Sequence, residues 1–169
     1  MIKSFFFKQV KENSPIGTTV LRVTAIDKDS NNNGRVTYHL KSNQLYFALD
    51  INSGMITTKK VFDREATQNY FCVVEARDQG QPSMTDICVV EISIGDENDN
   101  APQFESKNYN ISVFEDELVG KELLIVVATD RDAGINARVR YHITDGNTGE
   151  KSFVTAIGLD TKAIFEGKD

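Results

Sequence analysis

The feature that most constrains the fold is an internal repeat with a period of about one hundred residues. Residues 10–40 align without a gap on residues 113–143 at a constant offset of 103, and 13 of the 31 aligned positions are identical. A period of this length matches a small sandwich domain and exceeds the roughly 20–50 residues of a solenoid unit. The sequence therefore predicts two domains in tandem, residues 1–100 and residues 101–169.

Within the first repeat, apolar residues recur at every second position. Cys72, Val74 and Ala76 share one face of a segment, and Val90 and Ile92 share one face of another. This period is typical of strands that are buried on one side. Turn sequences such as NSPIG, DSNNNG and DQGQPS separate the segments at short intervals. Roughly seven short strands without a helical stripe predict an all-β fold, an antiparallel β-sandwich.

Composition narrows the possible partners. The 169 residues are 40% hydrophobic and 26% charged, which is enough apolar material for a real core. The net charge of -6 argues against nucleic acid and in favour of cations. No run of 18 apolar residues is present, so we expect any segment that secretes or anchors the protein to lie outside this chain.

The two cysteines, Cys72 and Cys88, fit neither a CxxC metal motif nor a dense disulfide framework. We expect them to be small core hydrophobes, and a bridge between neighbouring strands is the alternative.

The segment GDENDNAPQF, residues 95–104, lies between the repeats and contains acids and amides in succession. These side chains are hard oxygen ligands, so the segment is either a solvated turn or part of a cation site. Other acids follow strand ends, and successive strand ends alternate between the two poles of a sandwich. The acids and amides expected to meet at the joint are Glu12, Asp63, Glu65, Asn98, Asp99, Asp130 and Asp132.

Electrostatics favours a metal at that joint. Two carboxylates about 5 Å apart repel each other by about 3 kcal/mol at an effective dielectric constant near 20. A divalent cation with six to eight oxygen ligands converts this repulsion into attraction, and Ca²⁺ tolerates irregular carboxylate-rich geometry better than Mg²⁺ does. The absence of nearby Cys or His ligands argues against zinc and copper.

Several motifs in order resemble those of cadherin extracellular repeats, most closely the protocadherin, Fat and Dachsous types. They are the glutamate of VKEN, the segments FDRE and ARDQG, the linker DENDNAP, and the paired aspartates of DKDSNNN and DRDAGIN, and together they cover residues 4 to about 146. The resemblance implies Greek-key sandwiches in tandem, the second of them truncated. It also implies a calcium-dependent cell-cell adhesion module on the extracellular side of the plasma membrane, whose partners are other cadherin-type ectodomains in homophilic or heterophilic contact.

The resemblance also implies the calcium ligands. The first two ions would be held by Glu12, Asp63, Glu65, Asp99, Asp132 and the carbonyl group of Glu97. The third ion would be held by Asn98, Asp130, Asp132 and the carbonyl groups of Asn100 and Asn136. A weaker half-site toward a preceding repeat would consist of Asp27, Asp29, Asn33 and Asp78.

Two departures qualify this picture. The chain has no Trp, which excludes strand exchange anchored by a tryptophan for this fragment. The second repeat lacks the strands that correspond to residues 70–94, so its share of the third ion site is incomplete. Asn110, in the tripeptide NIS, is a glycosylation acceptor if the chain is secreted.

Alternative functions fit less well. An EF-hand in DKDSNNNG fails because Asn32 replaces the required glycine and Tyr38 the final glutamate. Asp63 with Glu65 could form a glycosidase pair, and Cys72 with His39 a nucleophile and its base. No substrate cleft is suggested, however, and the acids recur once per repeat as structural sites do. We therefore expect no enzymatic activity.

Overall fold

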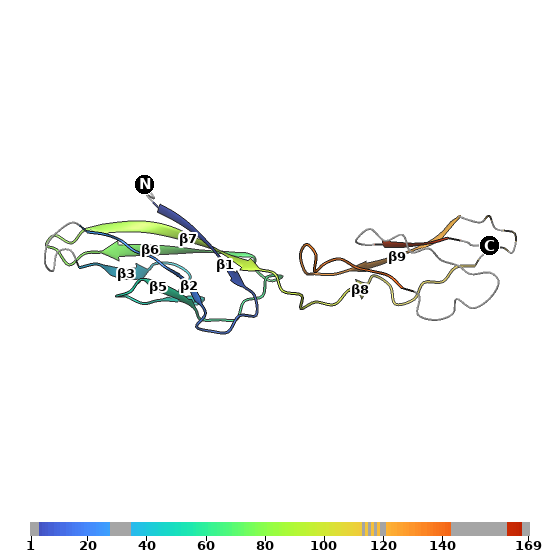
Figure 1. Ribbon diagram of the computed structural model, residues 1–169, viewed down its shortest axis with the longest axis horizontal. Coiled ribbons are helices and arrows are strands. Elements are labelled where there is room, and N and C mark those ends of the chain that lie inside the picture. The colour runs from blue at the N-terminus through green and yellow to red at the C-terminus, as the bar shows by residue number, and fades with distance from the viewer. Residues whose placement is uncertain are drawn as a thin grey trace. The chain divides into compact units, whose positions relative to one another are not determined.

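The computed structural model consists of two compact units, Met1–Glu97 and Asn98–Asp169, which we call the N-terminal and C-terminal units. It describes residues 4–27, 35–112, 114, 116, 118, 121–142 and 162–166. Strands are the only regular elements among these residues (Figure 1), which confirms the predicted all-β class. In this part of the chain, no helix has the length and hydrophobicity needed to cross a membrane.

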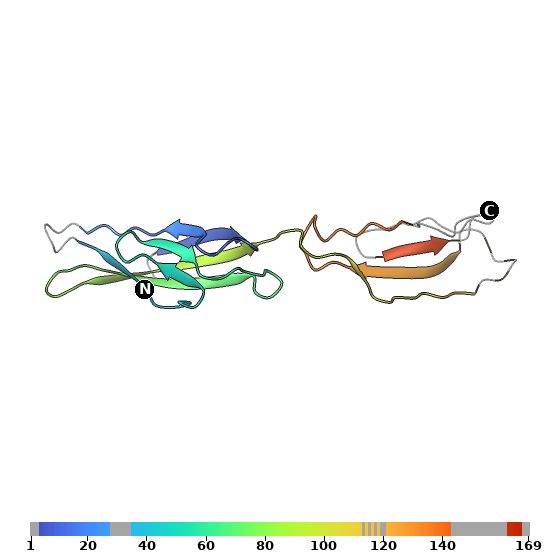
Figure 2. The ribbon, with the colours of Figure 1, turned by 90° about the horizontal axis from the view of Figure 1, so that it is seen from below.

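The N-terminal unit is a sandwich of two sheets (Figures 1 and 2). One sheet has the strand order β1-β7-β6-β3 and the other the order β2-β5-β4. The strands are β1 (Ser4–Lys11), β2 (Thr19–Arg22), β3 (Thr37–Leu40), β4 (Phe47–Leu49), β5 (Met55–Thr58), β6 (Asn69–Arg77) and β7 (Thr85–Gly95).

One pairing differs from the antiparallel arrangement that the sequence predicts. Strands β1 and β7 run parallel, whereas the other paired strands of this unit are antiparallel. A parallel pair needs a long connection rather than a hairpin. Here the connection is the remainder of the sandwich, because β1 and β7 are the first and last strands of the unit.

The core lies between the two sheets. The period-two pattern places Cys72, Val74 and Val90 of the four-stranded sheet at no more than 1% exposure, opposite the equally buried Phe47 and Ile56. The rings of Phe47 and Phe62 stack at 5.2 Å, and Tyr70 meets Phe62 edge to face at 4.9 Å. Phe62 therefore anchors the chain that follows it, residues 63–67, to the core.

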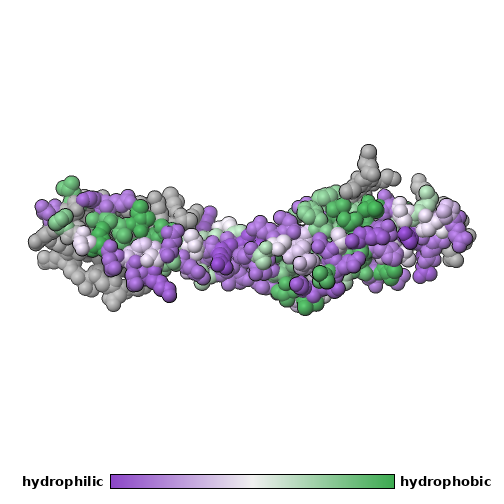
Figure 3. Space-filling model, turned by 180° about the vertical axis from the view of Figure 1, so that it is seen from behind, coloured by the Kyte–Doolittle hydropathy of each residue, from purple (hydrophilic) through white to green (hydrophobic). Residues whose placement is uncertain are grey.

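The outer face of the four-stranded sheet carries exposed aromatic side chains. Phe5 and Phe7 of β1 are 60% and 64% exposed, and Phe71 of β6 is 49% exposed. Phe7 and Phe71 flank Glu91 of β7, since both lie opposite it in the strand register. Figure 3 shows hydrophobic residues gathered on part of the surface of this unit.

The C-terminal unit contains one three-stranded antiparallel sheet among its described residues, in the order β10-β9-β8. Its strands are β8 (Gln103–Phe104), β9 (Glu122–Thr129) and β10 (Lys162–Glu166). Val126 and Ala128 of β9 are buried. Their counterparts in the first repeat are Val23, which is also buried, and Ala25, which is partly buried. Strand β10 lies in a segment where the sequence shows little of the repeat pattern.

A candidate metal centre

Glu12 lies at one pole of the N-terminal unit, where two core-facing rows end. The buried side of β1 continues from Val10 to Glu12, one residue past the strand, and that of β7 continues from Ile94 to Asp96, one residue past the strand, because residues two apart share a face. The amide of Glu12 donates a hydrogen bond of 2.9 Å to the carbonyl oxygen of Gly95, which keeps the two chains together past the last strand pair. Glu12 is only 1% exposed.

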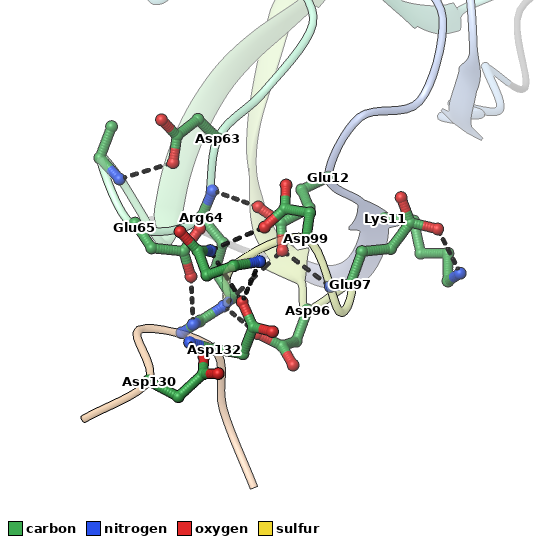
Figure 4. Close-up of polar contacts among 12 residues, drawn as sticks. Lys11, Glu12, Asp63, Arg64, Glu65, Asp96, Glu97, Asp99, Asp130 and Asp132 are labelled. Atoms are coloured by element: carbon green, nitrogen blue, oxygen red, sulfur yellow. Dashed lines mark hydrogen bonds and ion pairs between the residues drawn. The ribbon is translucent and has the colours of Figure 1, made fainter. Parts of the chain in front are cut away.

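The carboxylate of Glu12 joins three segments of the chain (Figure 4). One oxygen accepts a hydrogen bond of 2.9 Å from the backbone N–H of Arg64, and the other accepts one of 2.7 Å from the backbone N–H of Glu97. The loop after β5 and the end of β7 are thereby tied to the end of β1. A buried carboxylate needs such donors to remain charged.

Two further carboxylates surround Glu12. Glu12, Glu65 and Asp96 each offer an oxygen, and these oxygens all lie within 4.8 Å of one another. The Arg64 guanidinium contacts Glu65 and lies 2.6 Å from a carboxylate oxygen of Asp96. We call the carboxylates of Glu12, Glu65 and Asp96 the acid cluster. Hard oxygens at this density are the donor set that a divalent cation such as Ca²⁺ prefers.

Asp63, the other acid predicted for this pole, is exposed and shapes the loop. Its side chain accepts a hydrogen bond of 3.0 Å from the backbone N–H of Ala66, and its carbonyl oxygen accepts one of 3.1 Å from Thr67. Among the described residues, the group of mutually close carboxylates includes Glu12 and Glu65 but not Asp63.

In the C-terminal unit, Asp132 is buried, and only one of its two carboxylate oxygens accepts hydrogen bonds from described residues. One of its oxygens accepts hydrogen bonds from the backbone and side-chain nitrogens of Asn100, at 3.2 and 2.7 Å, and its own amide donates to Asp130 at 3.0 Å. The other oxygen, Oδ2, is buried and has no hydrogen-bond partner among the residues that the structure describes. A buried carboxylate oxygen without a donor is costly, and a bound cation would remove that cost. Asp132 therefore fits a calcium ligand.

The remaining predicted ligands of the joint lie in exposed or partly exposed chain. The exposed side chain of Glu97 pairs with Lys11 at 2.7 Å. The predicted ligand atom of Glu97 is its backbone carbonyl oxygen, which this ion pair does not involve. Asn98 and Asp99 are exposed, and the Asn100 amide also donates to Asp99 at 2.7 Å. Asn136 is half-buried in a turn, where its amide donates to the carbonyl oxygen of Ala133 at 3.1 Å.

At the opposite pole of the N-terminal unit, Asp27 and Asp78 line one cavity of about 450 Å³. Asp78 also closes a loop, since one of its oxygens accepts hydrogen bonds from the backbone N–H groups of Met84 at 2.9 Å and Gly80 at 3.0 Å. The bond from Met84, followed by that from Gly80, holds the pKa of Asp78 below its ordinary value despite the opposing effect of burial. Asp29 and Asn33 lie outside the described residues.

The geometry is unfavourable to a cysteine nucleophile. Burial raises the pKa of the Cys72 thiol to about 12, and this side chain points into the core with 0% exposure. His39 lies on the other face of the sheet, because its neighbour Tyr38 faces the core. Both cysteines are free, in agreement with the expected core role and not with a bridge.

Asn110 is exposed, as a glycosylation acceptor must be.

Sequence reasoning missed two residues of this centre, Arg64 and Asp96. Asp96 could have been found from periodicity, because it continues the buried row of Ile92 and Ile94 by two residues. Arg64 carried no comparable signal, since its loop has no regular period that predicts where a side chain points.

Comparisons with known proteins agree with the motifs. The family model described as Cadherin domain matches residues 6–95. The chain is 41% identical over 171 residues to the protocadherin-like wing polarity protein stan of Drosophila melanogaster. That alignment covers 92% of this chain and 5% of that protein. It is 38% identical over 151 residues to the human cadherin EGF LAG seven-pass G-type receptor 2, with 89% of this chain and 5% of that protein.

Among solved structures, the protocadherin gammaB4 extracellular domain matches with a TM-score of 0.85 and 27% identity. That alignment covers 98% of this chain and 28% of the other. The chain thus spans only a small part of the proteins that it resembles.

Proposed function

Because the chain belongs to the cadherin family, we propose that it is a calcium-dependent cell-cell adhesion module, in which Ca²⁺ at the joint between repeats stiffens an extracellular rod. Membership in a family of adhesion proteins decides against the glycosidase and nucleophile alternatives. Homophilic and heterophilic contact are both compatible with this role.

The observation that carries the proposal is the acid cluster at the pole of the N-terminal unit. The oxygens of its three carboxylates lie within 4.8 Å of one another, and the group remains net negative even with the Arg64 guanidinium beside it, so a divalent cation would still be attracted to it. In the C-terminal unit, the buried Oδ2 of Asp132, which has no hydrogen-bond partner in the described part of the chain, supports the same conclusion independently.

The proposed ligands of the joint come from both repeats and the linker. Each contributes hard oxygen atoms, either from a side chain or from a backbone carbonyl group. They are Glu12, Asp63, Glu65, Glu97, Asn98, Asp99, Asn100, Asp130, Asp132 and Asn136. A weaker half-site at the opposite pole of the first repeat would include Asp27 and Asp78, together with Asp29 and Asn33.

The expected affinity suits the outside of the cell. Extracellular modules typically bind Ca²⁺ with dissociation constants of about 10⁻⁴ to 10⁻³ M, which extracellular fluid approaches or exceeds and cytosol does not reach. At ten times the dissociation constant, one site stabilises the folded protein by about 1.4 kcal/mol. We therefore propose that the module acts on the extracellular side of the plasma membrane.

The proposed partner is another cadherin-type ectodomain. The exposed aromatic side chains Phe5, Phe7 and Phe71 give the outer face of the four-stranded sheet an apolar character suited to contact with another protein. We also propose that residues 1–100 are a complete repeat with its linker and residues 101–169 a partial second one.

Calorimetry of the 169-residue chain tests the calcium proposal. We expect 2 mM Ca²⁺, but not 2 mM Mg²⁺, to raise the unfolding temperature relative to EDTA. Asp99→Asn should remove most of that increase without lowering the unfolding temperature in EDTA. Glu105→Gln, which changes an exposed acid outside the proposed ligand set, is the control. Equal unfolding temperatures in Ca²⁺ and EDTA would refute the proposal.

A further inference from the structure

A positive charge already lies inside the acid cluster. The side chain of Arg64 is 11% exposed, and its Nε atom lies 2.6 Å from an Asp96 oxygen and 4.0 Å from a Glu12 oxygen. Its terminal nitrogen Nη2 contacts a Glu65 oxygen. One guanidinium group therefore faces all three carboxylates, which come from three separate segments of the chain (Figure 4).

The guanidinium stays charged in this environment. Burial by itself would lower the pKa of Arg64, but the charges of Asp96, Glu65 and Glu12 outweigh it, so that the pKa lies above its ordinary value. Three carboxylates and one guanidinium give the group a net charge of -2 instead of -3.

The contacts of Arg64 differ from those of an ordinary surface ion pair. Glu12 is fully buried at its side chain, and Glu65 and Asp96 are each 18% exposed. Removal of one partner from such a group leaves charges that solvent cannot fully screen. The backbone N–H of Arg64 also donates to Glu12, so the residue holds the cluster through both its main chain and its side chain.

We propose that Arg64 is the internal counter-ion of the acid cluster: it holds Glu12, Glu65 and Asp96 together in the calcium-free protein, and by lowering their net negative charge it weakens their affinity for Ca²⁺. The second part of this inference rests on the proposed function, whereas the first part does not. Arg64 thus acts as a positioning residue that makes the N-terminal unit less dependent on calcium for folding.

Substitution of Arg64 in the full 169-residue chain tests both parts. For Arg64→Gln we expect the unfolding temperature in EDTA to fall by about 10 °C, because three buried or half-buried carboxylates lose their counter-ion. We expect calorimetric titration to show Ca²⁺ binding about fivefold tighter, because the cluster regains a charge of -3. A purely structural residue would give no gain in affinity.

Two further variants separate charge from shape. Arg64→Lys keeps the charge but loses the planar fork, so its Ca²⁺ affinity should stay within about twofold of the unchanged protein while its unfolding temperature in EDTA falls. The double variant Arg64→Gln with Asp96→Asn restores the net charge of -2. We expect it to fold in EDTA, even if Arg64→Gln alone does not, and to bind Ca²⁺ with the original affinity.

The outcomes are distinguishable. Weaker or unchanged Ca²⁺ binding by a folded Arg64→Gln variant, or an unchanged unfolding temperature in EDTA, overturns the counter-ion role. A double variant that fails to fold in EDTA overturns it as well. If the unchanged protein shows no Ca²⁺ binding at millimolar concentration, the proposed function fails, while the unfolding temperatures in EDTA still decide whether Arg64 stabilises the cluster.

Discussion

The hydroxyl oxygen of Tyr38 accepts a hydrogen bond of 3.0 Å from the backbone N–H of Ala25. The equivalent pair in the C-terminal unit, Tyr141 and Ala128, makes the same contact at 2.8 Å. All four residues belong to the repeat with an offset of 103. The same two residue types therefore recur in both repeats for the same structural reason: each tyrosine hydroxyl accepts a hydrogen bond from a backbone N–H. That N–H belongs to Ala25, which follows β2, in the first repeat and to Ala128 of β9 in the second.

Removal of the Tyr38 hydroxyl should destabilise the N-terminal unit. Tyr38→Phe leaves the Ala25 N–H without its acceptor near the core, and we expect a loss of about 1–2 kcal/mol. Urea denaturation followed by circular dichroism measures this loss. Tyr141→Phe is the matched variant and should affect the C-terminal unit instead. An unchanged urea midpoint for Tyr38→Phe would show that water replaces the hydroxyl group without cost.

Glu75 should make the stability of the N-terminal unit depend on pH. The hydrogen bond from Lys41, at 3.0 Å, is the main reason that the pKa of Glu75 lies below its ordinary value of 4.5. A depressed pKa in the folded state means that the stabilisation is present above pH 4.5 and is lost as the pH falls through the folded-state pKa.

Urea midpoints between pH 7 and pH 3 test this expectation. Glu75→Gln should flatten the decrease in stability below pH 4.5. In a Lys41→Met background, where the ion pair is absent, the same substitution should have a much smaller effect. Equal pH profiles for Glu75→Gln and the unchanged protein would contradict the assignment.

Cys72 should react with alkylating reagents only after unfolding. Its side chain is 0% exposed, and burial raises the thiol pKa to about 12, so that almost no thiolate is present at pH 8. Labelling with iodoacetamide, followed by mass spectrometry, should modify Cys72 in urea but not in buffer. Rapid labelling of Cys72 in the folded protein would show that the sandwich opens readily at β6.

Asp132→Asn should separate calcium binding from stability. Asparagine keeps one oxygen as an acceptor for Asn100 but replaces the unpartnered carboxylate oxygen by an amide group. In EDTA we expect a change in unfolding free energy of less than about 1 kcal/mol. In 2 mM Ca²⁺ we expect at least half of the calcium-dependent rise in unfolding temperature to disappear. A full rise in this variant would remove Asp132 from the ligand set.

Local patterns in the sequence were sufficient for the fold class. Period-two alternation in segments such as residues 70–76 and 88–94 identifies strands and their buried faces, because side-chain direction along a strand depends only on residue parity. The position of Glu12 at a strand end follows from the turn sequence NSPIG, which comes directly after it. The repeat at an offset of 103 further identifies the same tyrosine and aspartate positions twice.

Only the tertiary structure decided how the acids are compensated. Glu12 meets the amide of Arg64 across 52 residues of sequence and that of Glu97 across 85 residues. Such contacts depend on how sheets and loops pack together, and no local period encodes them. The parallel pairing of β1 with β7, the place of Arg64 among three carboxylates, and the unpartnered oxygen of Asp132 are all consequences of that packing.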